Sequence, residues 1–270
     1  MTDEGSTPTE KNEDIKRQFG AVSESYVTSK IHSSPEDIEY CLKLIKPQKD
    51  WKAIDIATGT GHLALALAAH VDSIIGFDLT EEMLEQSVRV AKNRSIENFT
   101  IKQGDVHNIP YPDYTFDLVS VRIAPHHFHD IGKAIGEMTR ILKPGGFLFI
   151  EDTIAPEDET QARIFNEIER WRDSSHIRDL PASEWVKLLE KSGLKVLKTE
   201  KRVKKWPLKW WTERMNTPEE RVKKVLDLLH SHHQIYTDDL KIVHGKQDNP
   251  LDSWTILPNN GYFLAKKLRE

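Results

Sequence analysis

Short β-rich runs alternate with helical stretches between residues 52 and 152, and this alternation limits the folds open to the chain more than any other feature. The helical stretches are expected near 61–69, 81–93 and 130–142. Strands that alternate with helices form a parallel sheet with right-handed crossovers. The sequence therefore predicts an α/β fold, with strands at Lys52–Ala57, Ser73–Phe77, Phe99–Gln103, Phe116–Val121 and Phe147–Asp152.

Further elements are expected on both sides of this region. Residues 1–10 are polar and lack the apolar side chains that would offset the entropy of ordering, so we expect them to be disordered. A helix is expected from near Glu10, and another after Ser34-Pro35-Glu36-Asp37, which offers an N-cap, a first-turn proline and two acids. Beyond residue 155 we expect helices near 157–173, 183–191 and 217–230, a strand from Leu194 and a last strand at Gly261–Leu268.

The composition excludes several classes of function. The longest near-continuous apolar run, Leu63–Ala69, is far shorter than the roughly 20 residues that cross a bilayer, and we expect a cytoplasmic protein. The single cysteine, Cys41, excludes an intramolecular disulfide and thiolate-rich metal sites. The net charge of −5 over 270 residues gives no overall attraction to polyanions, so a nucleic-acid partner is not expected.

A glycine-rich turn, Asp55-Ile-Ala-Thr-Gly-Thr-Gly61, lies between the first predicted strand and a helix. Glycine lets the backbone turn tightly and approach a ligand closely. Asp78 ends the second strand, where it could accept hydrogen bonds from a ribose diol, and Asp105 follows the third strand at the same sheet edge. These features indicate a nucleotide-containing ligand, but they do not distinguish a nicotinamide or flavin enzyme from other classes.

The combined motifs resemble those of class I S-adenosylmethionine-dependent methyltransferases, of the type related to ubiquinone and menaquinone biosynthesis. One departure is Ala57, which stands where that family usually has glycine; its methyl group should be tolerated, at a slight expected cost in cofactor affinity. The motifs that carry the resemblance are Asp55–Gly61, Gly76–Thr80, Gly104–Asp113, Phe116–Asp130 and Leu142–Asp152.

By this resemblance the turn lies against the methionine part of the cofactor, Asp78 holds the ribose, and the backbone of Arg122 lies near the amino-acid moiety. Leu79 and Met83 would pack on the adenine or form part of the core, while Asp105 and Val106 would bind the adenine edge. The cofactor-binding residues that the resemblance implies are Asp55, Ala57, Gly59, Gly61, Asp78, Leu79, Met83, Gly104, Asp105, Val106 and Arg122.

The resemblance also implies a Rossmann-like, seven-stranded, mostly parallel sheet with helices on both faces. Residues 1–46 would form a disordered tip and an N-terminal helical lid, and 47–270 the methyltransferase domain. Within that domain, 47–155 would be the cofactor-binding core, and 156–270 would supply the acceptor-side helices and the last strands. Tyr26 and His32 belong either to the lid or to a surface helix.

Two residues at neighbouring strand ends could handle a proton. His126 follows the fourth strand and Asp152 ends the fifth, and residues at the carboxyl ends of parallel strands face the site. A histidine is a natural general base at neutral pH, and a carboxylate can orient it. The pair resembles the histidine and aspartate of some sugar O-methyltransferases; the alternative is that His126 only shapes its loop. No metal site is expected, because His126, His127 and His129 are too close in sequence to converge on one ion.

Residues 195–214 combine eight Lys or Arg with three tryptophans. This pattern could bind RNA or an anionic membrane surface, but lysines on an edge strand with tryptophans in a pocket or core explain it better. We therefore predict methyl transfer to a small organic acceptor, most simply at oxygen, with release of S-adenosylhomocysteine. The alternatives are a C-methyltransferase of quinone-type biosynthesis, an RNA methyltransferase and, more remotely, an NAD-dependent oxidoreductase. The sequence leaves open whether the protein is a monomer or a homodimer.

Overall fold

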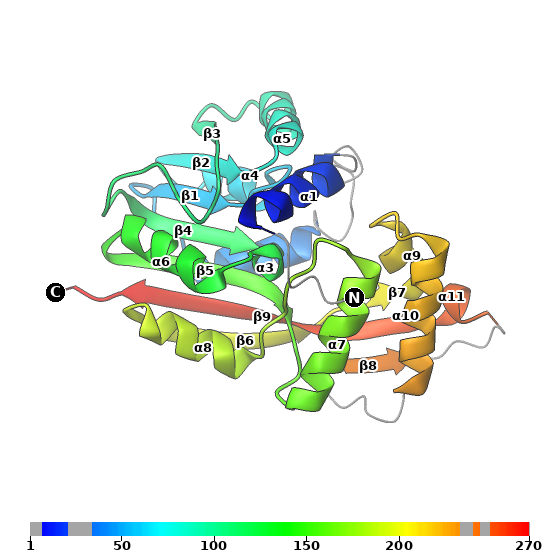
Figure 1. Cartoon of the computed structure of the whole chain (residues 1–270). Helices are drawn as coiled ribbons and strands as arrows, with labels where there is room; N and C mark the ends of the chain where they lie inside the picture. Colours follow the sequence, from blue (N-terminus) through cyan, green and yellow to red (C-terminus); the bar gives the residue numbers. More distant parts are fainter. Residues whose placement is uncertain (1–6, 21–33, 233–239, 244–248, 270) are drawn as a thin grey trace.

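The computed structural model describes residues 7–20, 34–232, 240–243 and 249–269. One central sheet has the order β3-β2-β1-β4-β5-β9-β6, with helices against both faces (Figure 1). Strands β1 to β5 pair parallel, whereas β9 runs antiparallel to β5 and β6, so the predicted α/β fold is confirmed. These strands are β1 (Lys52–Ile56), β2 (Ser73–Asp78), β3 (Phe99–Gln103), β4 (Phe116–Arg122), β5 (Leu142–Ile154), β6 (Leu194–Val203) and β9 (Thr255–Lys267).

The sheet has nine strands rather than the seven that we expected. The additional strands, β7 (Trp206–Pro207) and β8 (Leu240–Val243), pair antiparallel with the beginning of β9. Strand β9 starts at Thr255, well before the predicted Gly261, and its early residues therefore offer edges to further strands. The two residues of β7 are too few to show a periodic pattern, which is why the sequence did not reveal this strand.

The strands contribute to two cores, because successive side chains point to opposite faces of a sheet. Ile54 and Ile56 pack in the core on one face, and Ala53 packs in the core on the other. The first core includes α6 (Ile131–Ile141) and α8 (Ala182–Lys191), and the second includes α3 (Pro35–Ile45), α4 (His62–Ala68) and α5 (Glu81–Asn93).

A third apolar cluster lies beside the sheet, around Trp206, Trp211 and Trp254. It explains the concentration of tryptophan in the second half of the chain, because these side chains hold the additional helices together. Helices α7 and α10 pack against one another there (Figure 1). The helices of this region are α7 (Glu159–Arg172), α9 (Leu208–Glu213), α10 (Glu219–Ser231) and α11 (Pro250–Ser253). Among the described helices, none is both long and apolar enough to cross a membrane.

The N-terminal helix α1 (Pro8–Gly20) begins inside the stretch that we expected to be disordered. Thr7 and Glu10 explain the difference, since they form a reciprocal capping box. The Thr7 backbone N–H donates to Oε2 of Glu10 at 2.7 Å, and the Glu10 N–H donates to Oγ1 of Thr7 at 3.3 Å. Residues 1–6 of the expected tip, and the lid candidates Tyr26 and His32, lie outside the described residues.

Candidate active site

A cavity of about 140 Å³ opens where β1, β2 and β4 end, and α1 lies over it. This is the point at which the strand order reverses between β1 and β4, where open α/β sheets bind their ligands. Asn12, Ile15 and Phe19 of α1 complete the wall. All of the predicted cofactor residues except Gly61 line this cavity: Asp55, Ala57, Gly59, Asp78, Leu79, Met83, Gly104, Asp105, Val106 and Arg122.

Asp55, near the end of β1, supports the turn that follows this strand and is 2% exposed. Its two carboxylate oxygens accept hydrogen bonds from Oγ of Ser120 at 2.6 Å and from Oγ1 of Thr58 at 2.7 Å. Burial raises the pKa of Asp55 to about 6. Asp55 thus joins the turn at Thr58 to strand β4 at Ser120.

Three residues of this turn have left-handed backbone angles. The φ angles are +50° at Ala57, +54° at Gly59 and +84° at Gly61. This conformation explains why the related family prefers glycine at the first position, since a Cβ there is unfavourable by roughly 1–2 kcal/mol. Gly61 caps the start of α4, and a Cβ on it would lie 3.1 Å from Cβ of Ser87. Its role in the structure is thus close packing behind the cavity wall.

Asp78 joins the turn to the end of β2. Its Oδ2 accepts a hydrogen bond from the Gly59 N–H at 2.8 Å, and its Oδ1 accepts one from the Thr80 N–H at 2.9 Å. Burial raises the pKa of Asp78, and these backbone donors oppose the shift. A carboxylate oxygen can accept more than one hydrogen bond, so the group keeps capacity for a diol in the cavity.

Asp105 connects the cavity to α1. Its Oδ2 accepts a hydrogen bond from Nδ2 of Asn12 at 2.8 Å, and its Oδ1 accepts one from the His107 N–H at 2.9 Å and lies 2.6 Å from Nδ1 of His107. Burial would raise the pKa of Asp105, but the hydrogen bonds from His107 and Asn12 outweigh burial and lower it. Asp105 therefore fastens the covering helix to the sheet edge.

The cavity wall fits a nucleoside-containing ligand. The buried hydroxyl of Thr60 lines it and has no hydrogen-bond partner among the described residues. A Cβ built on Gly59 would meet nothing within 4 Å, so the backbone there borders open space. Together with Asp78 and the apolar side chains of Leu79 and Met83, these groups offer both polar partners and a surface for a flat ring.

A buried carboxylate, Glu151, fixes Arg122 at the end of β4. Oε2 of Glu151 accepts hydrogen bonds from Nε of Arg122 and, at 3.3 Å, from Sγ of Cys41. Oε1 accepts hydrogen bonds from Nδ2 of Asn260 at 3.1 Å and from the Tyr262 hydroxyl at 3.0 Å. Burial would raise the pKa of Glu151, but the positive charges of Arg122 and Lys204 hold it below its usual value. The cavity wall at Arg122 is therefore firmly anchored.

A second cavity, of about 50 Å³, lies on the far side of Arg122 and Ile123. These two residues, together with Phe19 and His127, line both cavities. Ile123 has a φ of +50°, an unfavourable conformation for a β-branched residue, and strained backbone of this kind is common at functional sites. The remaining wall of the second cavity is mainly polar and aromatic: Asp37, His126, Thr153, Glu169, Arg172, Asp173, Asp179, Lys204, Trp206, Trp210, Trp211, Arg214, Met215 and Asn260.

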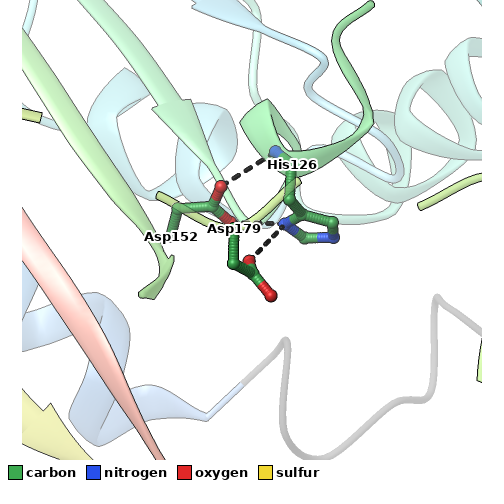
Figure 2. A group of neighbouring side chains, drawn as sticks. All are labelled: His126, Asp152 and Asp179. Carbon is green, nitrogen blue, oxygen red and sulfur yellow. Dashed lines mark hydrogen bonds and ion pairs between the residues drawn. The ribbon is translucent and has the colours of Figure 1, made fainter. Parts of the chain in front are cut away.

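The structure brings together the predicted pair His126 and Asp152 (Figure 2). Asp152 accepts two hydrogen bonds from His126, one from the backbone N–H at 2.9 Å and one from ring Nδ1 at 2.6 Å. Burial opposes protonation of the imidazole, but the charge of Asp152 outweighs it and raises the pKa of His126 to about 9. His126 borders the second cavity, whereas Asp152 lines neither of the two cavities described. Asp152 can thus orient His126 without touching a ligand.

The neighbouring histidines have different surroundings. Burial and the charge of His126 lower the pKa of His127 to about 3, which leaves it neutral. His129 stacks instead on His107, with ring centroids 3.7 Å apart. The sequence grouped these histidines, but the structure separates His129 from His126.

Asp179 is a third titratable residue beside His126 and Asp152, and the sequence did not point to it. Its Oδ1 lies 3.9 Å from Nδ1 of His126. Ligand atoms of His126, Asp152 and Asp179 lie within 4.8 Å of one another, a spacing that could also hold a metal ion. The 2.6 Å separation between His126 and Asp152, however, is that of a hydrogen bond. No local motif surrounds Asp179, so only its position in the fold identifies it.

Comparisons with known proteins agree with this geometry. A family model described as a methyltransferase domain matches residues 47–217. An uncharacterized methyltransferase of Bacillus subtilis, YcgJ, is 34% identical over 212 residues, which cover 77% of this chain and 82% of that protein. A demethylmenaquinone methyltransferase of Listeria welshimeri is 27% identical over 165 residues, 58% of this chain and 69% of that protein.

Solved structures show the same fold. The structure of a putative methyltransferase from Bacillus halodurans aligns with a TM-score of 0.81 and 30% identity, and covers 86% of this chain and 99% of its own. The structure of YcgJ itself aligns with a TM-score of 0.78 and 29% identity, and covers 87% of this chain and 99% of its own. With the strand order, the glycine turn and the acids Asp78 and Asp105 at the strand ends, these matches establish that the chain belongs to the class I S-adenosylmethionine-dependent methyltransferases.

Proposed function

We propose that the protein transfers a methyl group from S-adenosylmethionine to a hydroxyl group of a small polar acceptor. The first cavity would hold the cofactor, and the second would hold the acceptor. One observation carries the proposal: the two cavities share Arg122 and Ile123 as a wall, and His126 borders the second. Residues 47–155 would then form the cofactor side, and the helices after residue 156 the acceptor side.

The cofactor would be held by groups that the first cavity already presents. Asp78 would accept hydrogen bonds from the ribose, Leu79 and Met83 would cover the adenine, and Asp105 would bind its edge. When bound, S-adenosylmethionine supplies an electrophilic methyl group on a positively charged sulfur. The protein itself has to align the acceptor oxygen, exclude water and accept a proton.

His126 is suited to accept the proton. With Nδ1 directed to Asp152, ring Nε2 is the remaining nitrogen that can take it. At a pKa of about 9, the imidazole is mostly charged at neutral pH in the protein alone. A cation in the neighbouring cavity disfavours this charged form and so lowers the pKa of His126 toward the range of an efficient general base.

The wall of the second cavity favours a polar acceptor over a quinone with a long apolar tail. It includes the charged residues Glu169, Arg172, Asp173 and Lys204. An apolar tail placed against these side chains would cut them off from water, which is costly in free energy. C-methylation of a quinone-type acceptor is the second candidate, because a relative bears the name demethylmenaquinone methyltransferase.

An RNA acceptor fits the site less well. Trp206 and Trp211 are 9% and 2% exposed and pack in the third apolar cluster, so they offer no stacking platform on the outer surface for a run of bases. Lys204, which belongs to the basic stretch, pairs with Asp37 at 2.7 Å in the wall of the second cavity.

Two measurements test the proposal. S-adenosylhomocysteine should raise the melting temperature of the protein, whereas NADH should leave it unchanged, because only a ligand that binds the folded state stabilises it. Purified protein with methyl-labelled S-adenosylmethionine should label a member of a panel of small hydroxylated compounds, and His126→Gln should slow this reaction by about 10² or more without changing S-adenosylhomocysteine affinity. Stabilisation by NADH alone, or labelling only of a quinone ring carbon, would contradict it.

A further inference from the structure

Asp179 is a buried carboxyl group without a hydrogen-bond donor among the described residues. It lies in the segment between α7 and α8, is 1% exposed and lines the second cavity. Neither of its oxygens accepts a hydrogen bond from those residues. The nitrogens that face it within ion-pair range are Nδ1 of His126 and Nε2 of His176, each 3.9 Å away.

His176 does not supply a positive charge that could balance the Asp179 carboxylate. Its Nε2 lies 3.0 Å from Oδ1 of Asn166, which can only accept, so the proton on Nε2 is directed to Asn166. Burial, together with the charge of His126, lowers the pKa of His176 well below its usual value. Burial, together with the charges of Glu169 and Asp152, raises the pKa of Asp179 well above its usual value, and the charge of His126 opposes this rise. His126 is therefore the imidazolium that can favour the ionised form of Asp179.

The backbone holds Asp179 in place against His126. The N–H groups of Ile177 and Arg178 both donate to the carbonyl oxygen of His126, at 2.9 and 3.1 Å. Asn166 holds Asp179 itself, since it accepts from the Asp179 N–H at 2.7 Å and donates to the Asp179 carbonyl oxygen at 3.1 Å. The segment thus keeps the carboxyl group near the imidazole, as Figure 2 shows for the side chains.

Stability alone does not account for this arrangement. A buried carboxyl group without a donor is costly, and the fold already satisfies His126 through Asp152. The other charged or titratable groups that face the pair are Glu169 and Arg172 of α7, Asp173 after it, and His127 beside His126. Arg172 donates to Glu169 at 2.9 Å and lies 3.7 Å from Asp173, so its charge is largely directed to those two acids.

We infer that Asp179 is a positioning residue that, with Asp152, stabilises the imidazolium formed when His126 takes the proton of the acceptor hydroxyl. The inference rests on the proposed function. In this step the O–H bond breaks, its electron pair stays on the acceptor oxygen, and an N–H bond forms at Nε2 of His126. Two carboxyl groups from different segments then face one positive charge, and Asp179 acts on the transferred proton through the charge of His126.

The test is the titration of His126 in Asp179→Asn. Imidazole signals of isotope-labelled, cofactor-free protein are followed by NMR, and His126→Gln assigns the signal. We expect Asp179→Asn to lower the pKa of His126 by about one unit, a tenfold loss of proton affinity. Asp173→Asn is the matched control, since Asp173 is equally buried but bonds to Ser175, and it should shift His126 by less than half as much.

Thermal unfolding separates this role from a structural one. Removal of a buried carboxyl group that accepts no hydrogen bond should leave the melting temperature of Asp179→Asn unchanged or raise it. An unchanged His126 pKa in the folded variant would overturn the inference, and so would failure of both Asp179→Asn and Asp179→Ser to fold. Shifts of the His126 signal on addition of Zn²⁺ or Mn²⁺, lost in Asp179→Asn, would assign the group to a metal instead. Because the titration needs no cofactor or acceptor, its result is independent of the labelling assay that tests the proposed function.

Discussion

The backbone N–H of Gly59 donates a 2.8 Å hydrogen bond to Oδ2 of Asp78, so the glycine turn and the end of the second strand are joined through one carboxylate. The same group is the proposed ribose acceptor. Turn geometry and ligand binding therefore depend on one side chain.

Asp78→Ala should weaken S-adenosylhomocysteine binding by at least about 100-fold in calorimetry, because it removes the ribose partner and leaves the N–H groups of Gly59 and Thr80 without their acceptor. Asp72→Ala, at an exposed position before the same strand, should bind normally. Affinity within threefold of the native value in Asp78→Ala would exclude it as the ribose residue.

The left-handed turn allows two opposite substitutions to be compared. Gly59→Ala introduces a Cβ at φ +54° and should lower the free energy of unfolding by about 1–2 kcal/mol. Ala57→Gly relieves the same strain at φ +50°, but the gain is offset by the greater entropy of glycine in the unfolded chain, so the net change should be within about 1 kcal/mol of zero. Urea unfolding measures both, and a larger loss in Ala57→Gly would contradict this account.

Asn12→Ala should loosen the covering helix, since Asn12 donates the 2.8 Å hydrogen bond that joins α1 to Asp105. We expect faster dissociation of S-adenosylhomocysteine in stopped-flow experiments and faster hydrogen exchange over residues 8–20. Glu13→Ala, which removes only an exposed pair with Lys16, serves as the control. Equal dissociation rates in the two variants would show that this contact does not hold the helix over the cavity.

The pKa of His126 should depend on the charge of the bound cofactor. S-adenosylmethionine carries a positive charge that S-adenosylhomocysteine lacks, and a nearby like charge disfavours the imidazolium. The NMR titration of His126 should therefore give a lower pKa with S-adenosylmethionine than with S-adenosylhomocysteine. If both ligands give the same value, the imidazole is too far from the sulfur to serve the reaction.

Stability should fall at high pH because of His126. Its pKa is about 9 in the folded protein and about 6.5 in an unfolded chain, so folding favours the protonated form. This contribution is fully present below about pH 6.5 and is lost as the pH rises through about 9; it amounts to at most roughly 3–4 kcal/mol. The difference in unfolding free energy between native protein and His126→Gln should shrink over that range, and a constant difference would argue against a raised pKa.

The sequence predicted the parts of the site that depend on local chemistry. Gly59 and Asp78 stand at positions where a turn and a strand end require their residue types, and the structure brings them to one cavity. The sequence also predicted the parallel pairing of β1 to β5, because strands that alternate with helices are joined by right-handed crossovers.

What the sequence could not predict depends on contacts between distant segments. Asp179 matters because the segment after α7 folds back onto His126, and nothing adjacent to it in the sequence records that contact. Strand β7 exists because β9 offers it an edge. The early start of α1 is different, because it depends on neighbouring residues. The Thr7–Glu10 capping box could have been recognised in the sequence, but the polar composition of residues 1–10 led us to predict disorder there.

The environment of Glu151 has a consequence for how this chain can change. Its carboxylate accepts hydrogen bonds from Cys41, Arg122, Asn260 and Tyr262, which come from three well-separated parts of the sequence. The effects of substitutions at residues that share one such partner are not additive. Replacements at these positions should therefore be tolerated together more readily than singly, so that the beginning, middle and end of the chain are constrained to evolve in concert.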